Sequence, residues 1–148
     1  MKAKGLFPSL FLLVLFCAFV NKAPFQSMDE PWKESQLMPP SELNQIIKEE
    51  KPLETYIFNI GPSGSIKQSI YIGETQEESS LKKLEKEVRG LSKDADIVIY
   101  CGCCPFKDCP NVRPAFSLLN DLGFTDHKLL DLPQNLKVDW IDKGYPME

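Results

Sequence analysis

One short segment constrains the fold of this chain more than any other: an apolar run, a cysteine-rich loop and a helical pattern follow one another between residues 96 and 122. Asp96–Tyr100 predicts a central strand, because its four apolar residues show no polar alternation, as in strands covered on both faces. Arg113–Leu122 predicts a helix, with Pro114 in its first turn and Gly123 after its end. Four of the five cysteines lie between these two elements. The chain therefore gathers thiols where a strand ends and a helix begins.

Strands and helices alternate along the rest of the chain. The predicted strands are Leu53–Ile60, Ser69–Ile72 and Lys128–Leu132, and the predicted helices are Ser41–Lys51 with Ser41 as N-cap, Gln76–Leu91 and Pro133–Lys143. This order predicts the α/β class, with a parallel sheet and helices on both faces. Ligands of such sheets meet the carboxyl ends of the strands, and Cys101 follows one of these ends.

The first 23 residues have the pattern of a secretory signal peptide. Lys2 and Lys4 precede the apolar run Leu6–Val20, and Ala23 supplies a small residue after it. We therefore expect the protein to be periplasmic or secreted. A membrane anchor is expected only if Cys17 is lipidated, and Phe16 stands where such sites prefer a small side chain.

Residues 24–40 are polar, rich in proline and without periodicity, which predicts a flexible lead-in to a domain over residues 41–148. Trp32 is the one residue of this stretch that we expect to dock on the domain. Removal of residues 1–23 leaves 14 basic and 21 acidic residues, a net charge of −7. Nucleic acid is not an expected partner, because no basic stretch interleaved with aromatic residues is present. We expect a monomer.

The spacing of the cysteines argues against a structural disulfide framework. Once residues 1–23 are removed, all four remaining thiols lie within one loop, so a bridge among them cannot connect distant parts of the domain. A bridge from Cys104 to Cys109 would close a very short loop, for which the entropic gain is small. The four thiols are therefore expected to serve chemistry or metal binding.

The region from residue 96 onward resembles the rhodanese-like sulfurtransferases, in which a hydrophobic strand ends in the catalytic cysteine and a helix follows. The matching residues are Asp96–Cys101, Arg113-Pro114-Ala115, Gly123-Phe124, Leu129-Leu130-Asp131, Trp140 and Gly144-Tyr145-Pro146. The chain departs from the family in its longer cysteine loop. Asn59-Ile60-Gly61 also replaces the usual acidic and basic pair, and Leu132-Pro133 replaces a double glycine. The resemblance implies a divergent rhodanese-like domain.

The resemblance implies sulfur transfer without a cofactor or metal. Cys101 would take sulfur from a small anionic donor such as thiosulfate and pass it, as a persulfide, to a thiol acceptor. A helix N-terminus and backbone N–H groups lower a cysteine pKa from its usual ~8.5, and we expect the Cys101 sulfur to face solvent inside a cup of such groups. Gly102 permits a tight turn after it. Lys107 and Arg113 are candidates to attract the donor, and the remaining candidate substrate-binding residues are Cys103, Cys104 and Cys109.

Other interpretations stay open at this point. Cys109, or less favourably Cys103 or Cys104, could be the nucleophile, and the extra thiols could relay sulfur or resolve an oxidised nucleophile. The spacing of Cys101 and Cys104 is also that of a thiol–disulfide oxidoreductase. Four thiolates would suit zinc or cuprous copper. A catalytically silent binding module is the last alternative. His127, the single histidine, is expected to be structural or on the surface.

Overall fold

The computed structural model describes residues 30–49 and 54–148. The predicted signal segment, Cys17 and Lys51 lie outside them. The sheet has five strands in the order β1-β5-β4-β2-β3, and every pair of neighbours is parallel. The strands are β1 Leu37–Met38, β2 Tyr56–Asn59, β3 Ile70–Tyr71, β4 Ile97–Tyr100 and β5 His127–Leu130.

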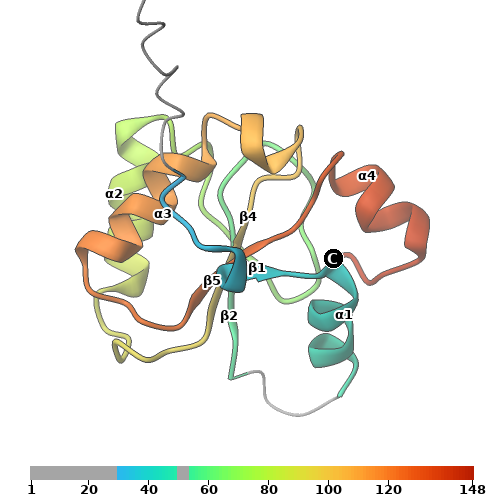
Figure 1. The fold of residues 1–148 in the computed structure, drawn as a ribbon, viewed down its shortest axis with the longest axis horizontal. Coiled ribbons are helices and arrows are strands. Elements are labelled where there is room, and N and C mark those ends of the chain that lie inside the picture. The colour runs from blue at the N-terminus through green and yellow to red at the C-terminus, as the bar shows by residue number, and fades with distance from the viewer. Residues whose placement is uncertain (1–29, 50–53) are drawn as a thin grey trace, which may run out of the picture.

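Helices cover both faces of this sheet, which confirms the predicted fold class. The helices are α1 Pro40–Lys48, α2 Glu78–Val88, α3 Val112–Asp121 and α4 Leu136–Asp139, and the shorter 3₁₀ turns are η1 Glu34–Gln36, η2 Phe106–Asp108 and η3 Ile141–Lys143. Figure 1 shows α2 and α3 on one side of the strands and α1 and α4 on the other. Within the described ranges, no helix has both the length and the apolar character needed to span a membrane.

The central strand β4 supplies both halves of the core. Ile97 and Ile99 pack in the cluster that contains α2 and α3, whereas Val98 and Tyr100 pack in the cluster that contains α1 and α4. All four side chains are fully buried, as the unbroken apolar run predicts. Cys101 continues the alternation and joins the first cluster, on the side of α3.

The domain begins earlier than residue 41. Leu37 and Met38 pair with Leu129 and Leu130 as an edge strand, and Trp32 is buried against Phe106 and Phe116. Residues 30–40 are therefore part of the packed structure, and the prediction of a flexible lead-in is wrong for them. A strand of two residues is too short to leave an alternating pattern in the sequence.

Two predicted helix ends also differ from the structure. Ser41 does not cap α1, because Pro40 already occupies its first helical position, where the fixed proline φ suits the helix. The last predicted helix is divided at Trp140 into α4 and η3. Trp140 is completely buried, and its indole Nε1 donates to the Pro146 carbonyl, so the packing of this ring accompanies the break.

Candidate active site

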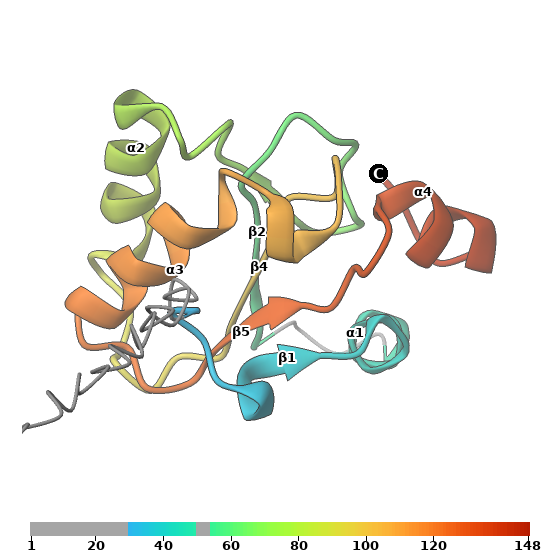
Figure 2. The same ribbon diagram turned by 45° about the horizontal axis from the view of Figure 1, so that its top comes forward.

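Cys101 lies directly after β4, at the carboxyl edge of the sheet, where Figure 2 shows the following loop between α3 and α4. Gly102 then turns the chain with a φ of +79°, in the left-handed region that favours glycine. A Cβ at Gly102 would lie 2.7 Å from Cβ of Leu136, the residue whose N–H donates to the Gly102 carbonyl over 2.9 Å. The turn at Gly102 therefore packs directly against Leu136, the first residue of α4.

The loop after β2 makes room for the Cys101 sulfur. A Cβ at Gly61 would lie 2.3 Å from Sγ and 3.0 Å from the carbonyl oxygen of Cys101, so any larger residue at this position would displace Cys101. Asn59 holds the turn: its Oδ1 accepts the Gly61 N–H over 3.1 Å, and its Nδ2 donates to the carbonyls of Ser63 and Gly64. Two loops from neighbouring strands therefore enclose one sulfur atom.

The four loop thiols lie together. Sγ of Cys103 is 3.3 Å from Sγ of Cys101, 3.2 Å from Sγ of Cys104 and 4.0 Å from Sγ of Cys109. All four are free thiols, but their exposure differs: Cys103 is exposed, whereas Cys101 is only 2 % exposed and Cys109 is buried. The prediction that the Cys101 sulfur faces solvent is therefore wrong. The sequence could not reveal this, because Cys103 folds back over Cys101 only through the turn at Gly102.

Hydrogen-bond donors converge on the Cys101 sulfur. They lower its pKa to about 6; the largest contribution comes from the Cys109 thiol, and the Cys103 N–H, the Asn111 amide and the Cys103 thiol add to it. Burial acts in the opposite direction and is outweighed. The donors are two thiols, one backbone N–H and one side-chain amide, and they replace the ring of backbone amides that the sequence predicts.

The neighbouring thiols stay protonated when Cys101 is ionised. Although Cys103 is an exposed residue, desolvation of its sulfur, together with the bonds to Cys104 and Cys101, raises its pKa to about 12. The hydrogen bond to Cys101 and burial raise the pKa of Cys109 as well. Among Cys101, Cys103 and Cys109, these shifts favour a single negative charge, on Cys101, at neutral pH.

Asn111 is a site residue that the sequence analysis missed. Its Nδ2 lies 3.4 Å from Sγ of Cys101, and its side chain is 1 % exposed. Thr75 donates to the Asn111 carbonyl over 2.6 Å, and the Gln76 N–H donates to Oδ1 over 3.0 Å, which orients the amide nitrogen toward the sulfur. An asparagine just before a helix usually caps it, but Asn111 has helical backbone angles and forms no side-chain cap. From sequence alone, Asn111 would be assigned as a helix cap, and its contact with the Cys101 sulfur would be missed.

Of the two candidate donor-attracting side chains, Arg113 braces the cysteine loop and Lys107 lies over a neighbouring aromatic ring. Nη1 of Arg113 donates to the Lys107 carbonyl over 2.7 Å, and its guanidinium stacks over Trp32 at 5.4 Å from the ring centroid. The Lys107 ammonium lies 5.8 Å from the centroid of the Phe106 ring. In the described part of the chain, neither side chain forms a hydrogen bond to the Cys101 sulfur.

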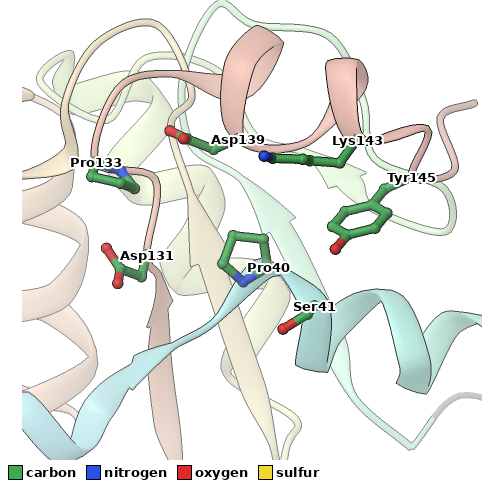
Figure 3. Close-up of a pocket in the computed structure, with 7 residues that line it drawn as sticks. All are labelled: Pro40, Ser41, Asp131, Pro133, Asp139, Lys143 and Tyr145. Carbon is green, nitrogen blue, oxygen red and sulfur yellow. The ribbon is translucent and has the colours of Figure 1, made fainter.

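Two clefts lie near the carboxyl edge of the sheet. One, of about 400 Å³, is lined by Cys103 and Gly102 together with Ser63, Gly64, Asn135, Leu136, Lys137 and Ile141. The other, of about 250 Å³, is drawn in Figure 3 and contains Asp131, Asp139 and Lys143. Asp139 accepts the N–H groups of residues 134 and 135 and so holds the start of α4. No cysteine is among the residues that line this second cleft.

Three of the thiols are also close enough to share a soft metal ion. The Sγ atoms of Cys101, Cys103 and Cys109 all lie within 4.8 Å of one another. Thiolates of this kind suit cuprous copper or zinc. Cys104 is displaced from this group, since its sulfur lies against Cys103, its neighbour in sequence.

Comparison with known proteins adds no relative to these observations. No family model matches the chain, and neither the curated proteins nor the solved structures include a match. The chemistry of the cysteine cluster therefore has to be argued from its geometry.

Proposed function

We propose that the protein is a rhodanese-like sulfurtransferase in which Cys101 carries sulfane sulfur as a persulfide. The donor is a small anionic sulfur compound such as thiosulfate, and the acceptor is a thiol. The observation that carries this proposal is a single cysteine, at the carboxyl end of the central strand, whose pKa is lowered to about 6 by donors around its sulfur. A thiolate at neutral pH is the form that attacks sulfur.

The reaction has two displacement steps. In the first, the Cys101 thiolate attacks the outer sulfur of thiosulfate, the sulfur–sulfur bond of the donor breaks, and sulfite leaves with the electron pair. In the second, an acceptor thiolate attacks the outer sulfur of the persulfide and Cys101 leaves as a thiolate. The Cys109 thiol and the Asn111 amide stabilise this thiolate in both steps.

The donor reaches Cys101 when the Cys103 side chain rotates outward. Cys103 is exposed and its sulfur touches that of Cys101, whereas Cys109 is enclosed in the core. Rotation of an exposed side chain is fast compared with catalysis. We expect these reactions to take place outside the cytoplasm, because residues 1–23 have the pattern of an export signal.

The test is transfer of sulfur from thiosulfate to cyanide. Cys101→Ser is expected to abolish the activity, because a serine hydroxyl is not ionised at neutral pH. Cys104→Ser, which removes a thiol whose sulfur lies against Cys103 instead of Cys101, is the matched control and is expected to retain it. Full activity of the Cys101→Ser protein would contradict the proposal.

A thiol–disulfide oxidoreductase is the second candidate. It is favoured by the 3.3 Å between the sulfurs of Cys101 and Cys103. In such an enzyme the Cys101 thiolate would attack a substrate disulfide, and Cys103 would then attack the mixed disulfide, release the reduced substrate and leave a Cys101–Cys103 disulfide. The two functions predict different changes in the mass of the protein after it has reacted with its substrate. A disulfide removes two hydrogens, whereas a persulfide adds one sulfur.

A further inference from the structure

The most reactive sulfur and the most accessible sulfur of the site belong to different residues. Cys101 carries the thiolate, but it is 2 % exposed and is not among the residues that line the neighbouring cleft. Cys103 is exposed and lines that cleft. The two Sγ atoms are 3.3 Å apart.

We infer that Cys103 relays sulfur: it takes the outer sulfur from the Cys101 persulfide and presents it, as its own persulfide, to a peptide-sized thiol in the cleft. This inference rests on the proposed function, because it begins from the persulfide on Cys101. It adds the route by which sulfur leaves the site, through Cys103, and the class of acceptor, a peptide-sized thiol.

The relay step needs no further reactant. Sγ of Cys103 forms a bond to the outer sulfur, and the bond between this sulfur and Sγ of Cys101 breaks. The electron pair of the broken bond stays on Cys101 as a thiolate, and the Cys103 thiol proton moves to the transferred sulfur. A persulfide anion on Cys101 and the thiol of Cys103 are thereby exchanged for a thiolate on Cys101 and a protonated persulfide on Cys103, with no change in total charge or oxidation level.

The difference between the pKa values of the two thiols favours transfer of sulfur from Cys101 to Cys103. A thiolate of low pKa is the better leaving group, and a thiol of high pKa gives the stronger nucleophile once it has lost its proton. Cys101, with a pKa of about 6, leaves readily, whereas the pKa of Cys103 is raised to about 12.

Space for the transferred sulfur opens when the Cys103 side chain moves outward. An in-line displacement places the outer sulfur between the two Sγ atoms, each about one ~2.05 Å sulfur–sulfur bond away or slightly more. The 3.3 Å separation is shorter than two such bonds, so Cys103 has to move outward. Its exposed side chain lines the cleft and can move toward it, whereas Cys101 is buried and packs close to Gly61.

The cleft suits a thiol carried by a peptide. Its volume is about 400 Å³, and its walls include the backbone of Gly64 and Gly102 and the side chain of Ile141, which is 45 % exposed. Lys137 on its rim is paired with Asp142 at 2.8 Å, which neutralises its charge. Cyanide needs no such space and can attack Cys101 directly once Cys103 has rotated away.

The experiment is a single turnover with reduced glutathione as the probe. The wild-type protein, Cys103→Ser and Cys104→Ser are loaded with thiosulfate, freed of excess donor and mixed with glutathione or with cyanide. Cys103→Ser is expected to load sulfur on Cys101 and to discharge it to glutathione about tenfold or more slowly than wild type, while discharge to cyanide stays within about twofold. Cys104→Ser is expected to behave as wild type. Peptide mapping of the loaded wild type should find sulfur on both Cys101 and Cys103.

The possible failures can be distinguished. If Cys103→Ser loads sulfur and discharges it to glutathione at the wild-type rate, the relay is wrong while the proposed function stands. If Cys103→Ser loses the reaction with cyanide as well, Cys103 acts in catalysis at Cys101 and not as a relay. If the wild-type protein takes up no sulfur, the proposed function fails and the relay fails with it.

Discussion

The Cys101 sulfur owes its low pKa to groups supplied by the loop between β4 and α3. Three of the donors belong to residues 103 and 109, and the fourth is the amide of Asn111, which is itself held by Thr75 and Gln76. The thiolate is therefore stabilised by local hydrogen bonds, without a basic side chain. Its reactivity should depend on these contacts and on pH.

The first prediction concerns the pH profile of Cys101. Because the folded-state pKa is about 6, the rate of alkylation of Cys101 by iodoacetamide should be constant above neutral pH and fall as the pH drops below 6. Asn111→Asp keeps the acceptor for the Gln76 N–H but replaces the amide donor with a negative charge, 3.4 Å from the sulfur. It should raise the midpoint by about 1 unit or more. The rate at Cys101 is followed by peptide mapping, and an unchanged midpoint would show that Asn111 does not act on the sulfur.

The second prediction concerns the space beside Cys101. Gly61→Ala places a methyl group 2.3 Å from the sulfur, so it should lower the free energy of unfolding by ~1–3 kcal/mol and reduce uptake of sulfur from thiosulfate. Gly90→Ala is the matched control, because a Cβ there meets no atom within 4 Å. It should stabilise the protein by about 0.5 kcal/mol. Urea unfolding measures both changes, and equal effects of the two substitutions would contradict the close approach at Gly61.

At the level of secondary structure, the cysteine loop is stabilised from outside the cluster. Phe106 in η2 packs edge-on against Trp32, and the Phe106 N–H donates to the Leu132 carbonyl. Arg113, in the first turn of α3, holds the carbonyl of residue 107 and stacks on the same tryptophan. The loop is thus attached to the segment that follows β5, to α3 and to Trp32 near the N-terminal edge of the described chain.

The third prediction follows from this attachment. Arg113→Ala removes one hydrogen bond of a charged donor and the stacking on Trp32, so it should lower the free energy of unfolding by about 1–2 kcal/mol. Lys107→Ala keeps the carbonyl that Arg113 binds and should have little effect on stability. Thermal unfolding compares the two variants. If Arg113→Ala leaves stability unchanged and raises the thiosulfate KM, Arg113 binds the donor instead of bracing the loop.

Much of the secondary structure could be predicted from the sequence, and the reasons for the exceptions are physical. The apolar run of β4 and the periodic leucines of α2 are long enough to carry their patterns. Leu37–Met38 is too short for this, and the division at Trp140 depends on tertiary packing. At the site, the place of Cys101 at the end of a strand could be predicted. Its cover by Cys103 and its contact with Asn111 depend on the shape of the loop, which has no periodicity to interpret.

In the whole molecule, the strand order β5-β4-β2 brings the site together. Cys101 follows β4 and Gly61 follows β2, and these two strands are parallel neighbours. Because neighbouring parallel strands end at the same edge of the sheet, Gly61 packs against the Cys101 sulfur although the two residues are 40 positions apart in the sequence. Residues 30–38 complete the far edge of this sheet through the pairing of β1 with β5. The fold of the site thus depends on a segment that precedes the expected domain boundary.

The fourth prediction tests this dependence. Trp32→Ala removes a ring that is 6 % exposed and contacts both Phe106 and Phe116, so it should lower the free energy of unfolding by ~3–5 kcal/mol. Lys33→Ala changes the exposed neighbour and should change stability by less than about 0.5 kcal/mol. Urea unfolding of the protein checks both. A small effect of Trp32→Ala would return this segment to a loosely attached lead-in.

The most direct measurement of the central claim is the mass of the intact protein after treatment with thiosulfate, followed by peptide mapping. The predicted result is the addition of one sulfur, reversed by thiol and located on the peptides that carry the β4 cysteine loop, with none added to Cys101→Ser. Loss of two hydrogens would indicate a disulfide instead. An unchanged mass, or full uptake of sulfur by Cys101→Ser, would contradict a persulfide at Cys101.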